Sequence, residues 1–134
     1  MNAKPFLDTD ILIYAFTTGD PRSARAEALL EEGGTVSVQV LNEFVNVWRR
    51  RLRRPWPEIE DALGVLKTLL DVPVPLTLEL HETAIGLARD YKISFYDGLI
   101  IAAASRAGCR VLYSEDLQDG RALIGVTIRN PFAE

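Results

Sequence analysis

Four acidic residues stand where the chain changes from one expected element to the next: Asp8, Glu43, Asp97 and Asp116. Asp8 and Asp116 follow short apolar runs typical of strands, Asp97 opens an expected helix, and Glu43 lies early in another. The carboxyl ends of parallel strands share one edge of a sheet, where ligands of such folds bind. We therefore expect the four side chains to converge, and carboxylates gathered in one cleft repel each other unless a cation lies among them.

Ligands that offer only oxygen atoms suit Mg²⁺ or Mn²⁺. Magnesium usually keeps several waters and accepts phosphate oxygens of a substrate. A metal-bound water is a nucleophile near neutral pH, and the metal offsets the charge that develops on phosphorus. Such chemistry needs no histidine or cysteine base, which agrees with a chain whose only histidine is His81. The residue types therefore predict metal-assisted phosphoryl chemistry.

Each acid taken singly has a simpler interpretation. Asp10 and Asp97 suit helix caps, Glu43 suits a solvated helix position, and Asp116 and Asp119 suit turns. Four acids at corresponding ends of strand–helix alternation are difficult to obtain from capping alone. The joint pattern therefore favours a functional site over the separate structural roles.

The elements that must position these acids begin with a strand that ends at Leu7. A tight turn follows, with Thr9 or Asp10 as the expected N-cap of a first helix. Near the other end, Ser94 with Asp97 three residues later resembles a capping box and opens a helix that ends at Gly108. The acids are therefore expected at junctions, where backbone amides and neighbouring elements are close.

The remaining elements alternate in type. Periodicity predicts helices over residues 20–32, with Asp20 as N-cap, and over about 38–52, 57–70 and 79–91. Short strands are expected at residues 35–38, 72–77, 110–113 and 124–128, the second of these at a sheet edge because of its prolines. Strands alternating with helices imply parallel pairing with right-handed crossovers and an α/β fold.

Composition limits the class of protein. The chain has 134 residues, 48% of them hydrophobic, and a net charge of −4, which predicts one globular domain over residues 1–134 and argues against a general nucleic-acid coat. Cys109 is the only cysteine, so no internal disulfide is possible. With no visible signal peptide or membrane span, these features favour a cytoplasmic protein.

The densest basic segment is residues 49–54, which holds five arginines. It is either a solvated helix end that complements the helix dipole or a contact for RNA phosphates or an acidic partner segment. Trp48 lies on the apolar stripe and is expected in the core. Trp56, between two prolines, is expected near the surface, where it would suit a dimer or partner interface.

Four segments resemble, in order, the motifs of PIN-domain ribonucleases. These are residues 6–14, 37–44, 94–104 and 112–117, which contain Asp8, Glu43, Asp97 and Asp116 respectively. The length and order of the motifs are most similar to VapC-type toxins of toxin–antitoxin modules. Position 10 is commonly Asn in these toxins and is Asp10 here, and position 114 is commonly Thr and is Ser114 here.

The resemblance implies a three-layer α/β/α sandwich with a central, mostly parallel sheet of four or five strands. It also implies a Mg²⁺- or Mn²⁺-dependent endoribonuclease, usually a homodimer, inhibited by a VapB-type antitoxin. Asp8, Glu43, Asp97 and Asp116 carry over as metal ligands and catalytic residues. Asp10, Ser114 and Asp119 are further candidates, because a carboxylate or hydroxyl near a metal can hold water or orient a ligand; for Asp119 a turn role before Gly120 is slightly favoured.

Two other functions remain open at this point. Asp8-Thr9-Asp10 resembles the nucleophile and acid pair of haloacid-dehalogenase-like phosphatases, although none of the lysines lies in a suitable strand-end turn. A non-catalytic module, either receiver-like or a PIN fold retained for binding, is the second alternative. A receiver-like module would need a lysine after the last strand, and this chain has none there. A PIN fold retained only for binding would be expected to have lost one or more of the four acids.

Overall fold

The computed structural model describes residues 4–133. Its centre is a four-stranded sheet in the order β1-β2-β4-β3, formed by β1 (Phe6–Leu7), β2 (Val111–Tyr113), β4 (Val126–Arg129) and β3 (Ala122–Leu123). β1, β2 and β4 pair in parallel, whereas β3 pairs antiparallel with β4. The α/β class and the mostly parallel sheet are therefore as predicted.

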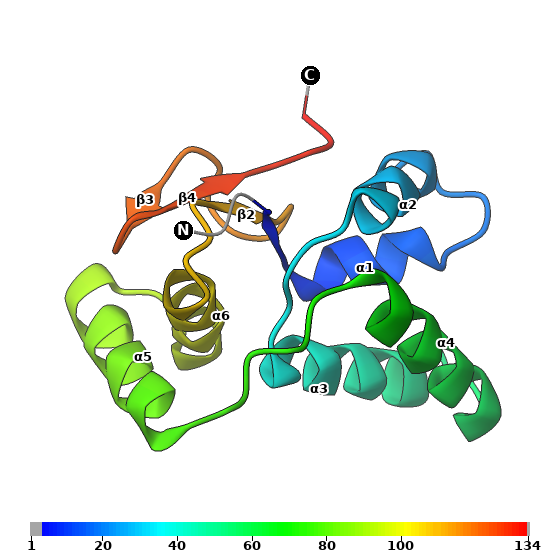
Figure 1. Cartoon of the computed structure of the whole chain (residues 1–134), viewed down its shortest axis with the longest axis horizontal. Coiled ribbons are helices and arrows are strands. Elements are labelled where there is room, and N and C mark those ends of the chain that lie inside the picture. Colours follow the sequence, from blue (N-terminus) through cyan, green and yellow to red (C-terminus); the bar gives the residue numbers. More distant parts are fainter. Residues whose placement is uncertain (1–3, 134) are drawn as a thin grey trace.

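Six α-helices accompany the sheet within residues 4–133 (Figure 1). They are α1 (Thr9–Ala15), α2 (Ser23–Glu32), α3 (Val38–Asn46), α4 (Trp56–Leu69), α5 (Leu78–Tyr91) and α6 (Phe95–Arg106), and a π-helical turn, Val47–Arg51, directly continues α3. α5 lies alongside α6, which packs against β2 and β4, while α1 packs against α2 and α3 (Figure 1). None of the helices in this part of the chain combines the length and apolar character needed to cross a membrane.

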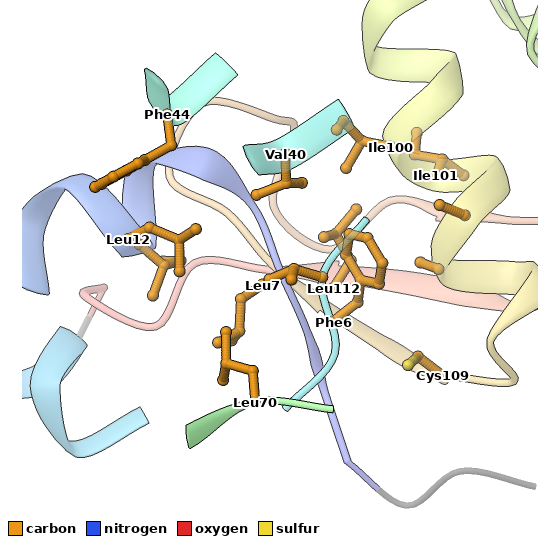
Figure 2. Close-up of a cluster of buried hydrophobic side chains, with 14 of the residues drawn as sticks. Phe6, Leu7, Leu12, Val40, Phe44, Leu70, Ile100, Ile101, Cys109 and Leu112 are labelled. Carbon is orange, nitrogen blue, oxygen red and sulfur yellow. The ribbon is translucent and has the colours of Figure 1, made fainter. Parts of the chain in front are cut away.

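The core lies between the sheet and the helices. Phe6, Leu7 and Leu112 are fully buried where β1 and β2 pair. Val40 of α3 and Ile100 of α6 pack in the same cluster (Figure 2). Strands this short are stabilised mainly by the apolar side chains on both faces, because two or three residues form few ladder hydrogen bonds.

The close contact of α5 with α6 requires a glycine at position 98. A Cβ atom placed on Gly98 would lie 2.9 Å from the backbone oxygen of Ala84, a distance that real Cβ contacts do not reach without movement of one helix. The glycine therefore sets how near the first turn of α6 can approach α5. Asp97 is its immediate neighbour, so this contact also fixes the location of one predicted site residue.

The structure corrects several predicted boundaries. Asp8, rather than Thr9 or Asp10, is the N-cap of α1, because its side chain accepts a hydrogen bond from Thr9 N. α2 begins at Ser23 and not near Asp20, whose carboxylate instead accepts a hydrogen bond from Arg22 N at 2.8 Å. Hence Asp20 orders the turn that precedes the helix.

Two predicted strands are reduced to isolated bridges, Phe6 with Thr35 and Ser37 with Val74. Prolines on both sides of Val74 provide no backbone N–H donor, which prevents a longer ladder. A short strand, β3, was not predicted; it pairs with β4 through a turn in which Gly125 has a φ of 83°.

Candidate active site

The site begins where β1 and β2 end side by side. Leu7 is opposite Tyr113 in the parallel ladder, so the next residues along each strand, Asp8 and Ser114, become neighbours. The Ser114 hydroxyl donates to Asp8 Oδ2 at 2.8 Å, and Thr9 N donates to Asp8 Oδ1 at 2.7 Å. Asp8 is buried and Ser114 has no solvent exposure. Strand pairing therefore brings together two predicted site residues that are distant in sequence.

Asp10 holds the loop that carries Asp116. Its Oδ2 atom accepts hydrogen bonds from Glu115 N at 2.7 Å and from Asp116 N at 3.0 Å. Its Oδ1 atom is buried and has no hydrogen-bond partner within residues 4–133. A buried carboxylate oxygen without a donor is costly, so this atom is a position where a cation or a water would be stabilised.

Glu43 reaches the same region from α3. Ser37 caps that helix by accepting a hydrogen bond from Val40 N, which places Glu43 in its second turn. Glu43 Oε1 accepts a hydrogen bond from Thr9 Oγ1 at 2.9 Å, and Oε2 accepts one from Gln39 Nε2 at 3.1 Å. The carboxylate is thus oriented by α1 and by its own helix. Thr9 and Gln39 are positioning residues that the sequence analysis did not identify.

A cleft of about 400 Å³ opens over these residues, and Asp10, Glu43 and Asp116 all line it. Asp97 lines a neighbouring cleft of about 280 Å³, which also includes Asp116. Asp116 therefore lies between the two clefts. Ser94 Oγ accepts a hydrogen bond from Asp97 N at 3.0 Å, so the predicted cap at the start of α6 is confirmed.

The proximity of the carboxylates changes their proton affinity. Burial, followed by the charge of Asp10, raises the pKa of Asp8 from 3.8 to about 7. Burial also raises the pKa of Asp10 to about 6, with the charge of Asp116 adding to it and the amide hydrogen bonds opposing it. The pKa of Asp97 is raised by burial and by the charge of Asp116. Burial is therefore the main cause of all three raised pKa values, and repulsion between neighbouring carboxylates adds to it.

The acids are near one another but do not form a closed set of ligands. Within residues 4–133, no three His, Cys, Asp or Glu side chains are placed so that together they could hold a metal ion. Glu43 already uses both carboxylate oxygens in hydrogen bonds. The oxygen-only donors, the raised pKa values and the unpartnered Asp10 Oδ1 fit a divalent cation, but binding one requires side-chain rotation.

A cluster outside the predicted residues fixes the start of the Asp116 loop. Arg22 Nη1 donates to Glu115 Oε1 at 2.7 Å and to Tyr14 Oη at 2.8 Å, and Tyr14 Oη donates to the same carboxylate oxygen at 2.5 Å. The guanidinium also lies over the Tyr14 ring at 3.9 Å. Glu115, whose backbone N–H binds Asp10, is therefore held at both its main chain and its side chain.

Asp119 lies apart from the other candidates. Its Oδ1 atom accepts a hydrogen bond from Asn130 N at 3.0 Å, which joins the loop after β2 to the end of β4. This contact agrees with the turn role that the sequence favoured over a role in the site.

Comparison with known proteins agrees with this geometry. The family model described as PIN domain matches residues 6–118, a segment that includes all four predicted acids. No curated protein matches the chain.

The similar solved structures include the following three. The VapC20 toxin of Mycobacterium tuberculosis, described as cleaving the sarcin–ricin loop, is 26% identical, with 83% of this chain and 88% of that chain covered and a TM-score of 0.67. A toxin–antitoxin complex from Klebsiella pneumoniae is 21% identical, with 96% and 98% covered and a TM-score of 0.71. VapBC2 from Rickettsia felis, bound to a DNA fragment from its promoter, is 16% identical, with 93% and 96% covered and a TM-score of 0.66. From the family match over most of its length, the chain belongs to the PIN domain family, and its fold is similar to those of the VapC20 toxin, the toxin–antitoxin complex and VapBC2.

Proposed function

We propose that this protein is a divalent-metal-dependent endoribonuclease, the toxin of a VapBC-type module acting in the cytoplasm. The observation that carries the proposal is the gathering of Asp8, Asp10, Glu43 and Asp116 at one end of the parallel sheet. An arrangement that raises the pKa of its own carboxyl groups costs stability. This loss of stability is expected where the fold holds carboxylates in place for a cation to bind.

The metal-binding residues we propose are Asp8, Glu43, Asp97 and Asp116, with Mg²⁺ or Mn²⁺ as the ion. When bound, the ion lowers the pKa of a water molecule and offsets the charge of a phosphodiester. Asp10 fixes the loop that presents Asp116 through two amide hydrogen bonds, and Ser114 keeps the Asp8 carboxylate in one orientation. Thr9 does the same for Glu43.

The two alternatives are weakened to different degrees. Membership of the PIN domain family argues against a haloacid-dehalogenase-like phosphatase. A PIN fold retained only for binding would be expected to have lost an acid, whereas this chain has all four. Titration calorimetry with Mn²⁺ distinguishes the second alternative, because a wild type that binds no Mn²⁺ would support the non-catalytic module.

Cleavage of RNA tests the main proposal. The neighbour described as cleaving the sarcin–ricin loop makes a ribosomal RNA hairpin the first substrate to assay, followed by transfer RNA. We expect cleavage that requires Mn²⁺ or Mg²⁺, stops in excess chelator, and is abolished in Asp8→Asn and Asp97→Asn. Asp61→Asn is the matched control, because Asp61 is an exposed acid on α4. Cleavage that persists in chelator or in Asp97→Asn would refute the assignment.

The structures of toxin–antitoxin complexes among the neighbours support a VapB-type antitoxin as partner. We also propose a homodimer, with the chain acting as a single domain. Several large apolar side chains are exposed and available for such interfaces, including Trp56 at 50% exposure and Leu78 at 72%. Light scattering of the purified protein tests the dimer directly.

A further inference from the structure

The arginines of residues 49–54, which follow α3, differ in the contacts that their side chains make. The Arg49 guanidinium lies 4.8 Å from the centre of the Trp56 ring and donates to Arg54 O at 3.2 Å. Arg54 lies over the Trp48 ring and pairs with Glu58 at 3.4 Å. These two arginines therefore stabilise the junction between α3 and α4, as the structural interpretation of the segment expects.

Arg51 differs from both. It is exposed, it has no ion-pair or hydrogen-bond partner for its side chain among residues 4–133, and it lines the same cleft as Asp10, Glu43 and Asp116. It is also the only Lys or Arg among the described residues that line this cleft. A guanidinium that shares a cleft with three carboxylates, yet pairs with none of them, is available to bind an anion.

The π-helical turn explains how Arg51 reaches this position. In an uninterrupted α-helix of 3.6 residues per turn, the eight residues from Glu43 to Arg51 would take the chain about 80° past the Glu43 face. The turn Val47–Arg51 bonds with wider i→i+5 spacing, so each residue rotates the chain less. Arg51 consequently falls back toward the face of Glu43, over the cleft.

We propose that Arg51 is a substrate-binding residue of this cleft, whose guanidinium holds a phosphate of the RNA strand. This inference rests on the proposed function, because it names the group of the substrate that Arg51 contacts. A phosphodiester strand would be attracted by the guanidinium and, once the acids hold a divalent ion, by that ion as well. An acidic peptide segment is the less suitable occupant, since its own carboxylates would meet Asp10, Glu43 and Asp116.

The test measures binding and cleavage separately. Fluorescence anisotropy with a single-stranded oligodeoxythymidine, in Mn²⁺ and at several salt concentrations, reports phosphate contact independently of RNA cleavage. For Arg51→Ala we expect at least about tenfold weaker binding, as for loss of one charged hydrogen-bonding group, and a salt slope that is smaller by about 0.7. Arg51→Lys should recover part of the affinity, because it keeps the charge and loses the two-point geometry.

Arg50→Ala is the matched control, since Arg50 is an exposed neighbour in the same turn that lines none of the clefts described above. In RNA cleavage, Arg51→Ala should raise KM or lower kcat/KM while Mn²⁺ affinity by calorimetry does not weaken. Equal effects of Arg51→Ala and Arg50→Ala would overturn the inference. The inference would also be overturned if Arg51→Ala weakened binding of polyglutamate but not of the oligonucleotide. If the wild type cleaves no RNA but binds the oligonucleotide through Arg51, the proposed function fails and the phosphate contact stands.

Discussion

The hydrogen bond from Ser114 to Asp8 gives the sharpest test of the site. Ser114 has no solvent exposure, and its hydroxyl both donates to Asp8 Oδ2 at 2.8 Å and accepts from Leu117 N at 3.1 Å. Ser114→Ala removes both contacts and adds no bulk. At pH 8.5, where Asp8 is ionised, the lost bond is charge-assisted, and we expect a fall in the free energy of unfolding of roughly 2–3 kcal/mol. At pH 5.5 Asp8 is protonated, and the loss should be nearer 1 kcal/mol, typical of a neutral hydrogen bond.

The dependence on pH follows from the Asp8 carboxyl group. Its pKa of about 7 already includes a lowering by the Ser114 hydrogen bond, so the substitution should raise that pKa further. Because Mn²⁺ competes with the proton for the carboxylate, the pH at which Mn²⁺ binding is half-maximal should move upward. Urea denaturation in chelator at the two pH values and calorimetry with Mn²⁺ measure both effects. Ser105→Ala, which removes an exposed hydroxyl bonded to Ile124 O, is the control. Equal destabilisation at both pH values, or none, would refute the reasoning.

Three further predictions concern charge, packing and the loop after β2. In chelator, the raised pKa of Asp8 makes its contribution to the free energy of unfolding largest below pH 4, and that contribution is lost as pH rises through about 7. Asp8→Asn should therefore unfold at a higher temperature than the wild type at pH 8. Added Mn²⁺ should reverse that order. Gly98→Ala should lower the free energy of unfolding, measured in urea, by about 1–3 kcal/mol, because the new Cβ would lie 2.9 Å from the Ala84 oxygen. Gly64→Ala is the control: nothing lies within 4 Å of its Cβ, so it should stabilise α4 by up to about 1 kcal/mol. Arg22→Gln removes the ion pair to the loop that carries the last predicted acid. It should lower cleavage by several-fold with little change in the urea midpoint, because ion pairs open to solvent contribute little to stability. An unchanged cleavage rate would count against a positioning role for Arg22.

Sequence patterns predicted the junctions of the fold well because local rules determine them. Ser94 caps its helix as expected, and Trp48 is buried while Trp56 is half exposed, also as expected. The strand predicted at residues 72–77 is reduced to a single bridge. Strand pairing needs a partner strand and backbone N–H donors, and Pro73 and Pro75 have no N–H. Propensity along the chain carries no information about that partner.

In the candidate site, too, features set by local sequence were predicted and contacts between distant segments were not. Asp8, Asp97 and Asp116 were predicted as site residues because each lies beside a junction between elements, a feature visible in the sequence, and Glu43 was predicted from its place early in a helix. Their supporting contacts were not found, since Tyr14 meets Glu115 across 101 positions and Arg22 meets it across 93. The position of Arg51 beside the cleft was also not predicted, because the composition of a π-helical turn does not distinguish it from the α-helix that it continues.

The pairing of β1 with β2 also determines when the candidate site can be completed during synthesis of the chain. Asp8 and Ser114 are 106 positions apart, so at roughly 5–20 residues per second they leave the ribosome about 5–20 s apart. Until then the amino-terminal acids have neither their hydroxyl donor nor the loop that Asp10 holds. A growing chain therefore lacks the complete candidate site for most of its translation, because the last segments to emerge supply contacts that the first acids need.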